Sequence, residues 1–211
     1  MKRFCDHVIG TDVSQNQITN AIPKDNVEYR CIKGEDLSFA SSNSIDLITV
    51  ATALHWINID EFVREVKRVL KPSTGVLAIW TYRYAQLENP QANEIIHEFF
   101  YKTLFPYWNE KQHLVEDFYE SFLPQLPFNT TMKQFTIERH IQMSPEAFIG
   151  FVETGSACQT FRRQNGEVIY QQTLNTLKSK LIQILSSSQH DPIQINFSNP
   201  IRLYLFRKNQ P

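Results

Sequence analysis

The sequence predicts an α/β fold, built on a doubly wound parallel sheet that carries a helical cap. Strand-like and helical segments alternate over the first 85 residues, and this alternation is typical of parallel sheets. The strand-like runs are rich in branched apolar residues, as expected where helices cover both faces of a sheet. From residue 86 onward, longer and aromatic-rich segments with helical periodicity predict the cap.

Four strands are predicted in the first part, over residues 8–12, 27–32, 45–50 and 76–81. A short helix follows the first strand, with Ser14 as its N-cap in a capping-box pattern. A longer helix has Asp60 as its expected N-cap and ends before Pro72. Its apolar residues share one side, so we expect its basic residues to face solvent: Arg64, Lys67, Arg68 and Lys71.

The second part is predicted to be mainly helical. Helices are expected over residues 90–105, 110–122, 144–154 and 167–186, and one strand over residues 132–141. Residues 193–197 and 201–207 are predicted to pair as a hairpin. We therefore expect a single domain over residues 1–211, made of a partial core (1–85), a helical cap with one strand (86–190) and a terminal β-hairpin (191–211).

Composition excludes several classes of protein. The 211 residues are 42% hydrophobic and 20% charged, which are globular values, and the formal net charge of −1 argues against a general nucleic-acid or membrane-surface binder. Three widely spaced cysteines predict free thiols in a reducing compartment, and the six histidines lack metal-ligand spacing. We expect a cytoplasmic protein with no metal and no nucleic-acid or membrane partner, with a homodimer left open.

Asp12 is the first candidate for a binding role. It ends a strand just before a helix cap, as an acidic residue does at the second strand of a nucleotide-binding βαβ unit, where it hydrogen-bonds a ribose hydroxyl. The alternative is a helix N-cap or a solvated turn. A first strand, a glycine-rich turn and a helix, roughly 20 residues in all, should come earlier. Only six residues precede His7, and the chain contains no Gly-x-Gly.

The segments after Asp12 form an ordered series of motifs. Residues 32–39 read Ile-Lys-Gly-Glu-Asp-Leu-Ser-Phe, and residues 45–56 end in Ala-Leu-His-Trp. Residues 65–80 contain Glu-Val-Lys-Arg-Val-Leu-Lys-Pro and then Gly-Val-Leu-Ala-Ile-Trp. Over residues 7–81 this series resembles class I S-adenosylmethionine-dependent methyltransferases.

The resemblance extends into the cap and has two departures. Residues 104–109 and 144–148 are similar to the cap of the small-molecule branch that includes trans-aconitate-methyltransferase-like proteins. Ser38 replaces the usual proline, and Ser73-Thr74-Gly75 replaces paired glycines.

The resemblance implies S-adenosyl-L-methionine as cofactor and a small-molecule substrate, and it assigns residues to the cofactor by motif. Asp12 would bond the ribose diol, and Val13 would pack on the adenine. Gly34 and Glu35 would approach the adenine amino group, and Ala51 would lie beneath the sulfonium.

Substrate candidates follow the strand ends: His55, Trp56, Tyr82 and Arg83. Methyl transfer mainly needs alignment of nucleophile, methyl group and leaving sulfur. A carboxylate acceptor needs no general base, whereas a phenol or thiol would be helped by one, for which His55, Tyr82 and also Tyr84 are candidates. Arg83 could clamp an acidic substrate. The alternatives are that Trp56 anchors the next helix and that His55 makes a structural hydrogen bond.

The absent glycine-rich segment shapes the functional expectation. The family's strand order is 3-2-1-4-5-7-6, so we expect a Rossmann-like sheet that lacks its first, central strand. Losing even ~4 kcal/mol of cofactor contacts would weaken binding about a thousandfold, so we expect a truncated chain with weak or no activity. The alternative is a non-catalytic, methyltransferase-like binding or regulatory module. A nicotinamide oxidoreductase is disfavoured by the Leu-His-Trp turn and the predicted hairpin.

Overall fold

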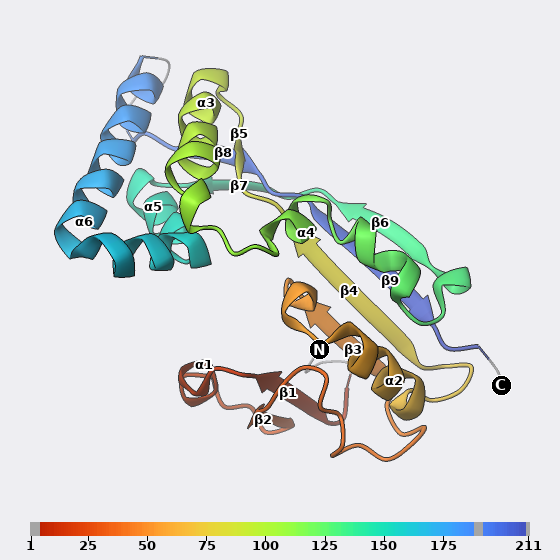
Figure 1. The fold of residues 1–211 in the computed structure, drawn as a ribbon. Helices are drawn as coiled ribbons and strands as arrows, with labels where there is room; N and C mark the ends of the chain where they lie inside the picture. Colours follow the sequence, from red (N-terminus) through yellow and green to blue (C-terminus); the bar gives the residue numbers. More distant parts are fainter. Residues whose placement is uncertain (1–4, 188–191, 210–211) are drawn as a thin grey trace. The chain divides into compact units, whose positions relative to one another are not determined.

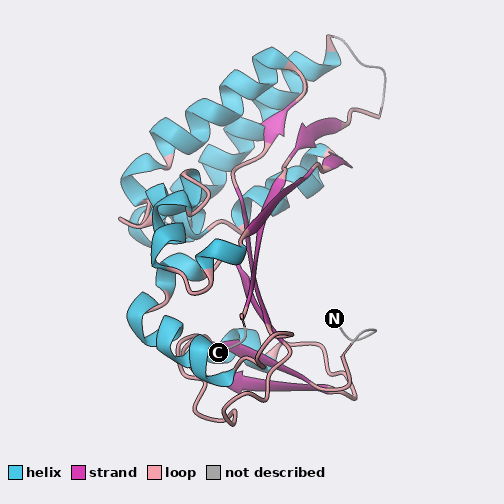
Figure 2. Cartoon of the chain, turned by 90° about the vertical axis from the view of Figure 1, so that its right-hand side faces the viewer, coloured by secondary structure: helices cyan, strands magenta, loops and turns pink. Residues whose placement is uncertain are grey.

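The computed structural model describes residues 5–187 and 192–209 (Figure 1). This part of the chain divides into two compact units. The first unit comprises residues 5–80, 119–134 and 204–209, and the second comprises residues 81–118, 135–187 and 192–203. Helices and strands both occur along the chain (Figure 2), so the predicted α/β class is confirmed.

A β-α-β segment opens the first unit. Strands β1 (Val8–Asp12) and β2 (Val27–Cys31) are parallel, with Asp12 opposite Cys31. Helix α1 (Gln15–Thr19) connects them, and Ser14 caps it as predicted, because its Oγ accepts the Gln17 N–H. The alternation of apolar and polar residues was sufficient to locate these elements.

A four-stranded sheet has the order β3-β4-β9-β6. Its strands are β3 (Leu47–Ala51), β4 (Val76–Tyr82), β9 (Ile201–Arg207) and β6 (Lys133–Ile137). Strands β3 and β4 are parallel, with Ala51 opposite Trp80. Leu77, Ala78 and Ile79 are buried, as the apolar run in β4 predicts.

No strand among the described residues joins β1 to β3, so the β1-β2 pair and the β3-β4-β9-β6 sheet are separate. The two orders fit the strand order expected from the resemblance. The β2-β1 pair takes the positions 3-2, and β3-β4-β9-β6 takes the positions 4-5-7-6. Each of the two sheets therefore has a strand order that occurs within the order of the family.

Helix α2 (Ile59–Val69) connects β3 to β4. The predicted cap at Asp60 is wrong by two positions, because Asn58 is the N-cap and its Oδ1 accepts the Glu61 N–H. Asp60 lies in the first turn, where a negative charge interacts favourably with the helix dipole.

The second unit contains a sheet of order β5-β8-β7, with β8 antiparallel to both neighbours. Its strands are β5 (Gln86–Leu87), β8 (Ile195–Ser198) and β7 (His140–Met143). The predicted terminal hairpin is therefore wrong, since β8 and β9 belong to different sheets. In the described part of residues 86–190 there are three strands, β5, β6 and β7, where one was predicted.

Asn199 explains why no hairpin forms. This buried residue lies between β8 and β9, and its side-chain amide donates to the Arg83 carbonyl at 2.6 Å. Its backbone N–H donates to the Arg139 carbonyl at 3.0 Å. Hydrogen bonds that a tight turn would make within itself are thus made to other segments.

The helices of the second unit enclose an apolar core that includes Phe148, Leu181 and Phe197. The helices are α3 (Pro90–Glu98), α4 (Gln112–Glu116), α5 (Pro145–Glu153) and α6 (Ser156–Ser186). The predicted helix over residues 110–122 is wrong beyond α4, because Phe118 and Tyr119 have φ of 56° and 63°, in the left-handed region. None of the helices in the described ranges is both long and apolar enough to cross a membrane.

Candidate functional site

The carboxyl end of β1 presents two of the predicted cofactor residues. Asp12 is exposed, and its Oδ1 accepts the Ser14 N–H at 2.7 Å. Ser14 caps α1, so Asp12 is not the helix N-cap. The Val13 side chain is 70% exposed, which is unusual for a valine that directly follows a strand. Asp12 and Val13 thus form an accessible carboxylate beside an accessible apolar side chain.

The loop after β2 starts next to Asp12. Cys31 is opposite Asp12 in the parallel register, and its Sγ lies 3.5 Å from the Val13 carbonyl oxygen. Gly34 and Glu35, both half-buried, follow three and four residues later. The loop that contains Gly34 and Glu35 therefore begins beside the carboxyl end of β1.

Gly34 also connects this loop to the turn after β3. A Cβ atom added at Gly34 would lie 2.9 Å from Ile57 Cδ1, so the glycine backbone packs directly on that side chain. Ile57 follows the 3₁₀ turn Leu54–Trp56, which carries His55. Only a residue without a side chain allows this approach without displacing Ile57.

The turn after β3 carries three predicted residues in different environments. Ala51 is exposed at the end of β3, and Trp56 is 55% exposed. His55 is 6% exposed, and its Nδ1 lies 2.7 Å from the Tyr119 hydroxyl oxygen. Thr52, between Ala51 and His55, has a φ of 47°, and strain of this kind in a non-glycine residue is frequent at binding sites.

The remaining predicted substrate residues lie in the second unit. Tyr82 ends β4 and is half-buried, with Arg139 Cζ 5.9 Å from its ring centroid. Arg83 Cζ lies 4.0 Å from the Phe118 ring centroid, and Arg202 Cζ lies 4.7 Å from the same centroid. The Arg83 Nε is buried and makes no hydrogen bond within the described residues. Two guanidinium groups therefore share one aromatic ring.

Tyr84 is poorly suited to act as a base. Its ring stacks on Phe100 at a centroid distance of 3.9 Å. Burial, and then the nearby Glu116 carboxylate, raise the pKa of Tyr84 far above its ordinary value. The tyrosine therefore stays protonated at neutral pH and cannot accept a proton from a substrate.

Three residues in these environments were missed from the sequence. Tyr119 contacts His55, Arg202 shares a ring with Arg83, and Arg68 binds the loop after β2. Arg68 lies in the Glu-Val-Lys-Arg motif but was expected on a solvated face. Nothing in the local sequence indicates the other two, because each meets its partner only through long-range folding.

Comparison with known proteins places this geometry in a family. Residues 1–79 match the profile of the methyltransferase domain family. A putative methyltransferase from Dictyostelium discoideum is 31% identical over 210 residues, which cover 99% of this chain and 76% of the relative. The chain belongs to the class I methyltransferase family. A probable S-adenosylmethionine-dependent methyltransferase from Saccharomyces cerevisiae is 27% identical over 104 residues, covering 46% of this chain and 35% of that protein.

Solved structures agree on the fold. A putative type II methyltransferase from Anaeromyxobacter dehalogenans superposes with a TM-score of 0.76 at 23% identity, covering 100% of this chain and 84% of that one. In this methyltransferase fold, ligands bind at the carboxyl ends of the parallel strands. In the present methyltransferase these ends are Asp12 and Cys31 in the β1-β2 pair, and Ala51 in the β3-β4-β9-β6 sheet. No group of three or more His, Cys, Asp or Glu side chains in the described ranges could hold a metal ion.

Proposed function

We propose that this methyltransferase binds S-adenosylmethionine at the carboxyl ends of β1 and β3 and transfers its methyl group to a small acidic acceptor. Two contacts within one unit carry the proposal. Cys31, just before the loop that contains Gly34 and Glu35, lies opposite Asp12, and Gly34 packs on Ile57 directly after the turn that carries His55 and Trp56. Asp12, Gly34 and Glu35 are positions that the family resemblance assigns to the cofactor.

The residues of this edge fit the chemistry of the cofactor. The exposed Asp12 carboxylate can accept hydrogen bonds from a ribose diol, and the exposed Val13 side chain offers an apolar surface to a purine. Glu35 can accept a hydrogen bond from an exocyclic amine. When bound, the cofactor supplies an activated methyl group on a sulfonium. The chain's contribution is to align the acceptor with that methyl group and to exclude water.

The environment of Arg83 suits an anionic group. The Arg83 guanidinium is held over the Phe118 ring, and its buried Nε has a donor to offer. A carboxylate oxygen can attack the methyl carbon directly. The new O–CH₃ bond forms as the S–CH₃ bond breaks, and the electron pair of the broken S–CH₃ bond stays on sulfur. No proton needs to be removed from such an acceptor.

A non-catalytic binding module is the second candidate. It is favoured by the separation of the β1-β2 pair from the β3-β4-β9-β6 sheet among the described residues. Such a module would bind the cofactor weakly or not at all.

Calorimetric titration with S-adenosylhomocysteine distinguishes the two functions. We expect micromolar binding by the chain, and roughly tenfold or greater weakening in Asp12→Asn, because charge-assisted hydrogen bonds contribute roughly 1.5–3 kcal/mol. Asp46→Asn is the control, since it removes the same charge from an exposed residue that precedes β3. Absence of binding by the unmodified chain would contradict the proposal and favour the binding module.

The acceptor is tested by methyl transfer from radiolabelled S-adenosylmethionine to panels of small carboxylic acids and small phenols. We expect transfer to acids, and loss of that transfer in Arg83→Met. Transfer to phenols alone, or equal rates in the variant, would contradict the acidic acceptor.

A further inference from the structure

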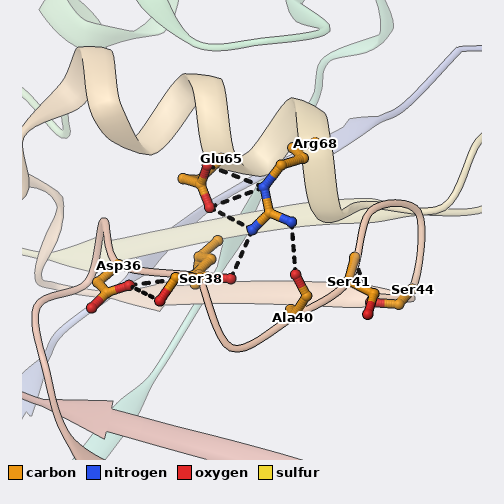
Figure 3. Close-up of polar contacts among 8 residues, drawn as sticks. Asp36, Ser38, Ala40, Ser41, Ser44, Glu65 and Arg68 are labelled. Carbon is orange, nitrogen blue, oxygen red and sulfur yellow. Dashed lines mark hydrogen bonds and ion pairs between the residues drawn. The ribbon is translucent and has the colours of Figure 1, made fainter.

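The place of Arg68 among the basic residues of α2 predicted that it would face solvent. This prediction is wrong. Its side chain is 32% exposed and reaches from the last turn of α2 to the loop after β2 (Figure 3). Nη1 donates to the Ala40 carbonyl at 2.7 Å, and Nη2 donates to the Leu37 carbonyl at 2.9 Å. A single guanidinium therefore satisfies two carbonyl groups of one loop.

Glu65 holds this guanidinium in place. The Arg68 Nη2 donates to Glu65 Oε2 at 2.6 Å, and Nε donates to Oε1 at 3.1 Å. The Glu65 side chain is only 17% exposed, and the hydrogen bond from Arg68 lowers the pKa of its carboxyl. A fork of donors in fixed planar geometry is a property of arginine that lysine does not share.

Among the described residues, the other hydrogen bonds in the middle of the loop are made within the loop itself, while Gly34 at its start packs on Ile57. Near its start, Asp36 Oδ1 accepts hydrogen bonds from the Ser38 N–H and hydroxyl (Figure 3), and the Ala40 N–H donates to the Leu37 carbonyl. Arg30 Cζ lies 4.6 Å from the Phe39 ring centroid. These contacts are local or weak, whereas the contacts from Arg68 attach the loop to a helix about thirty residues later in the sequence.

We infer that Arg68 is a positioning residue for cofactor binding, which fixes the loop so that Gly34 and Glu35 are presented to the adenine. The inference rests on the proposed function, because that function assigns the adenine to this loop. Its physical basis is preorganisation: a loop that is already ordered loses less conformational entropy when a ligand binds. Arg68 touches the loop and not the ligand, so it acts through Gly34 and Glu35.

The test compares Arg68→Lys, which keeps the charge but loses the fork, with Arg64→Lys, the same change at an exposed position of the same helix. Amide hydrogen exchange of residues 36–40 reports loop order without any ligand. Titration with S-adenosylhomocysteine reports binding, and the unfolding midpoint reports overall stability. In Arg68→Lys we expect exchange of these amides to accelerate about tenfold, and affinity to fall about tenfold. Arg64→Lys should change neither.

A chemical-rescue arm separates positioning from general stability. In Arg68→Ala, added methylguanidinium at millimolar concentration should restore slow exchange and part of the affinity, which a merely structural defect would not show. If Arg68→Ala does not fold, Glu65→Gln serves instead, because it loosens the guanidinium while leaving both carbonyl contacts possible, and it should give intermediate effects.

The outcomes distinguish this inference from the proposed function. Failure of the unmodified chain to bind S-adenosylhomocysteine overturns the proposed function and, with it, the cofactor role of Arg68. Binding by the unmodified chain together with unchanged affinity and loop exchange in Arg68→Lys overturns the inference alone. A lowered unfolding midpoint with exchange accelerated equally in β3 and in the loop also overturns it.

Discussion

At the scale of single residues, the contact between His55 and Tyr119 determines the role of His55 in the turn after β3. The sequence left His55 between a pocket wall and a structural hydrogen bond. Both side chains are buried, and the 2.7 Å contact between His55 Nδ1 and the Tyr119 hydroxyl favours the structural interpretation. Tyr119 and the preceding Phe118 hold left-handed backbone conformations, which persist only where the surrounding structure enforces them.

Replacement of the Tyr119 hydroxyl tests this pairing. Tyr119→Phe should lower the free energy of unfolding by about 1–3 kcal/mol, because it leaves the buried His55 ring without that hydrogen bond. The control is Tyr29→Phe, which removes an exposed hydroxyl bond to the Ile22 carbonyl and should cost about 0.5 kcal/mol or less. Denaturant unfolding measures both values. Equal effects of the two variants would show that the His55 contact contributes nothing special.

At the scale of elements, the turn between α2 and β4 shows how this chain departs from the paired glycines of its family. Ser73 has a φ of 63°, the left-handed conformation that glycine adopts without steric cost. Gly75 is confined for a different reason, since a Cβ atom there would lie 2.6 Å from the Lys71 carbonyl oxygen. Its N–H donates to that same oxygen at 2.9 Å. The turn thus needs a glycine at one position and tolerates a strained serine at another.

Two substitutions in this turn should have opposite effects. Ser73→Gly removes the steric cost of a left-handed backbone at a residue with a side chain, but glycine also gives the unfolded chain more conformational entropy. The net effect should be a stabilisation of the protein by about 0.5–1 kcal/mol. Gly75→Ala forces backbone apart and should destabilise it by about 1–3 kcal/mol. Denaturant midpoints at constant slope measure both changes. Destabilisation by Ser73→Gly would show that the serine side chain makes a necessary contact.

At the scale of the whole molecule, the groups with perturbed pKa values are divided between the two units. Burial raises the pKa of Cys158 to about 12 and raises the pKa values of Tyr84, Tyr101 and Tyr170, all in the second unit. In the first unit, the hydrogen bond from Arg68 lowers the pKa of Glu65. The raised pKa values predict a loss of stability at alkaline pH in the second unit, whereas carboxyl groups with lowered pKa values, Glu65 and Glu167, occur in both units.

Alkaline conditions should destabilise the second unit selectively. A group whose pKa is raised on folding stabilises the fold below its unfolded pKa, and that contribution is lost at higher pH as the unfolded chain ionises. The loss should begin near the unfolded pKa of about 8.5 for cysteine and continue past about 10 for tyrosine. Tyrosinate absorbance and far-ultraviolet circular dichroism follow it. We expect part of the 8 tyrosines to ionise only as structure is lost, and titration of all of them in the intact fold would contradict this.

At acidic pH, the dependence of stability on pH has the opposite sign. The lowered pKa of Glu65 contributes stability above its unfolded pKa of about 4.3, and this contribution is lost as the pH falls further. The effect is screened because the Arg68 partner is one-third exposed, so it should be smaller than the alkaline one.

The sequence predicted the parts of the fold that depend on local pattern. Strands β1 to β4 and the cap at Ser14 follow from alternation and capping signals within a few residues. Predictions failed where a distant contact decides the local conformation. The predicted hairpin does not form, because Asn199 makes hydrogen bonds to the Arg83 and Arg139 carbonyls. The helix predicted over residues 110–122 ends early, because Phe118 and Tyr119 have left-handed backbone conformations. Helical periodicity likewise could not show that Arg68 reaches two loop carbonyls.

By itself, the sequence determined the α/β class, the family resemblance and the residues nominated for the cofactor, because motif order and hydrophobic period are properties of the chain. Only the tertiary structure decided how those residues meet. Parallel register sets Cys31 opposite Asp12, Gly34 packs on Ile57, and His55 bonds to Tyr119. The physical reason is that hydrogen bonds and close packing join segments far apart in sequence, and no local pattern encodes which partner each side chain finds.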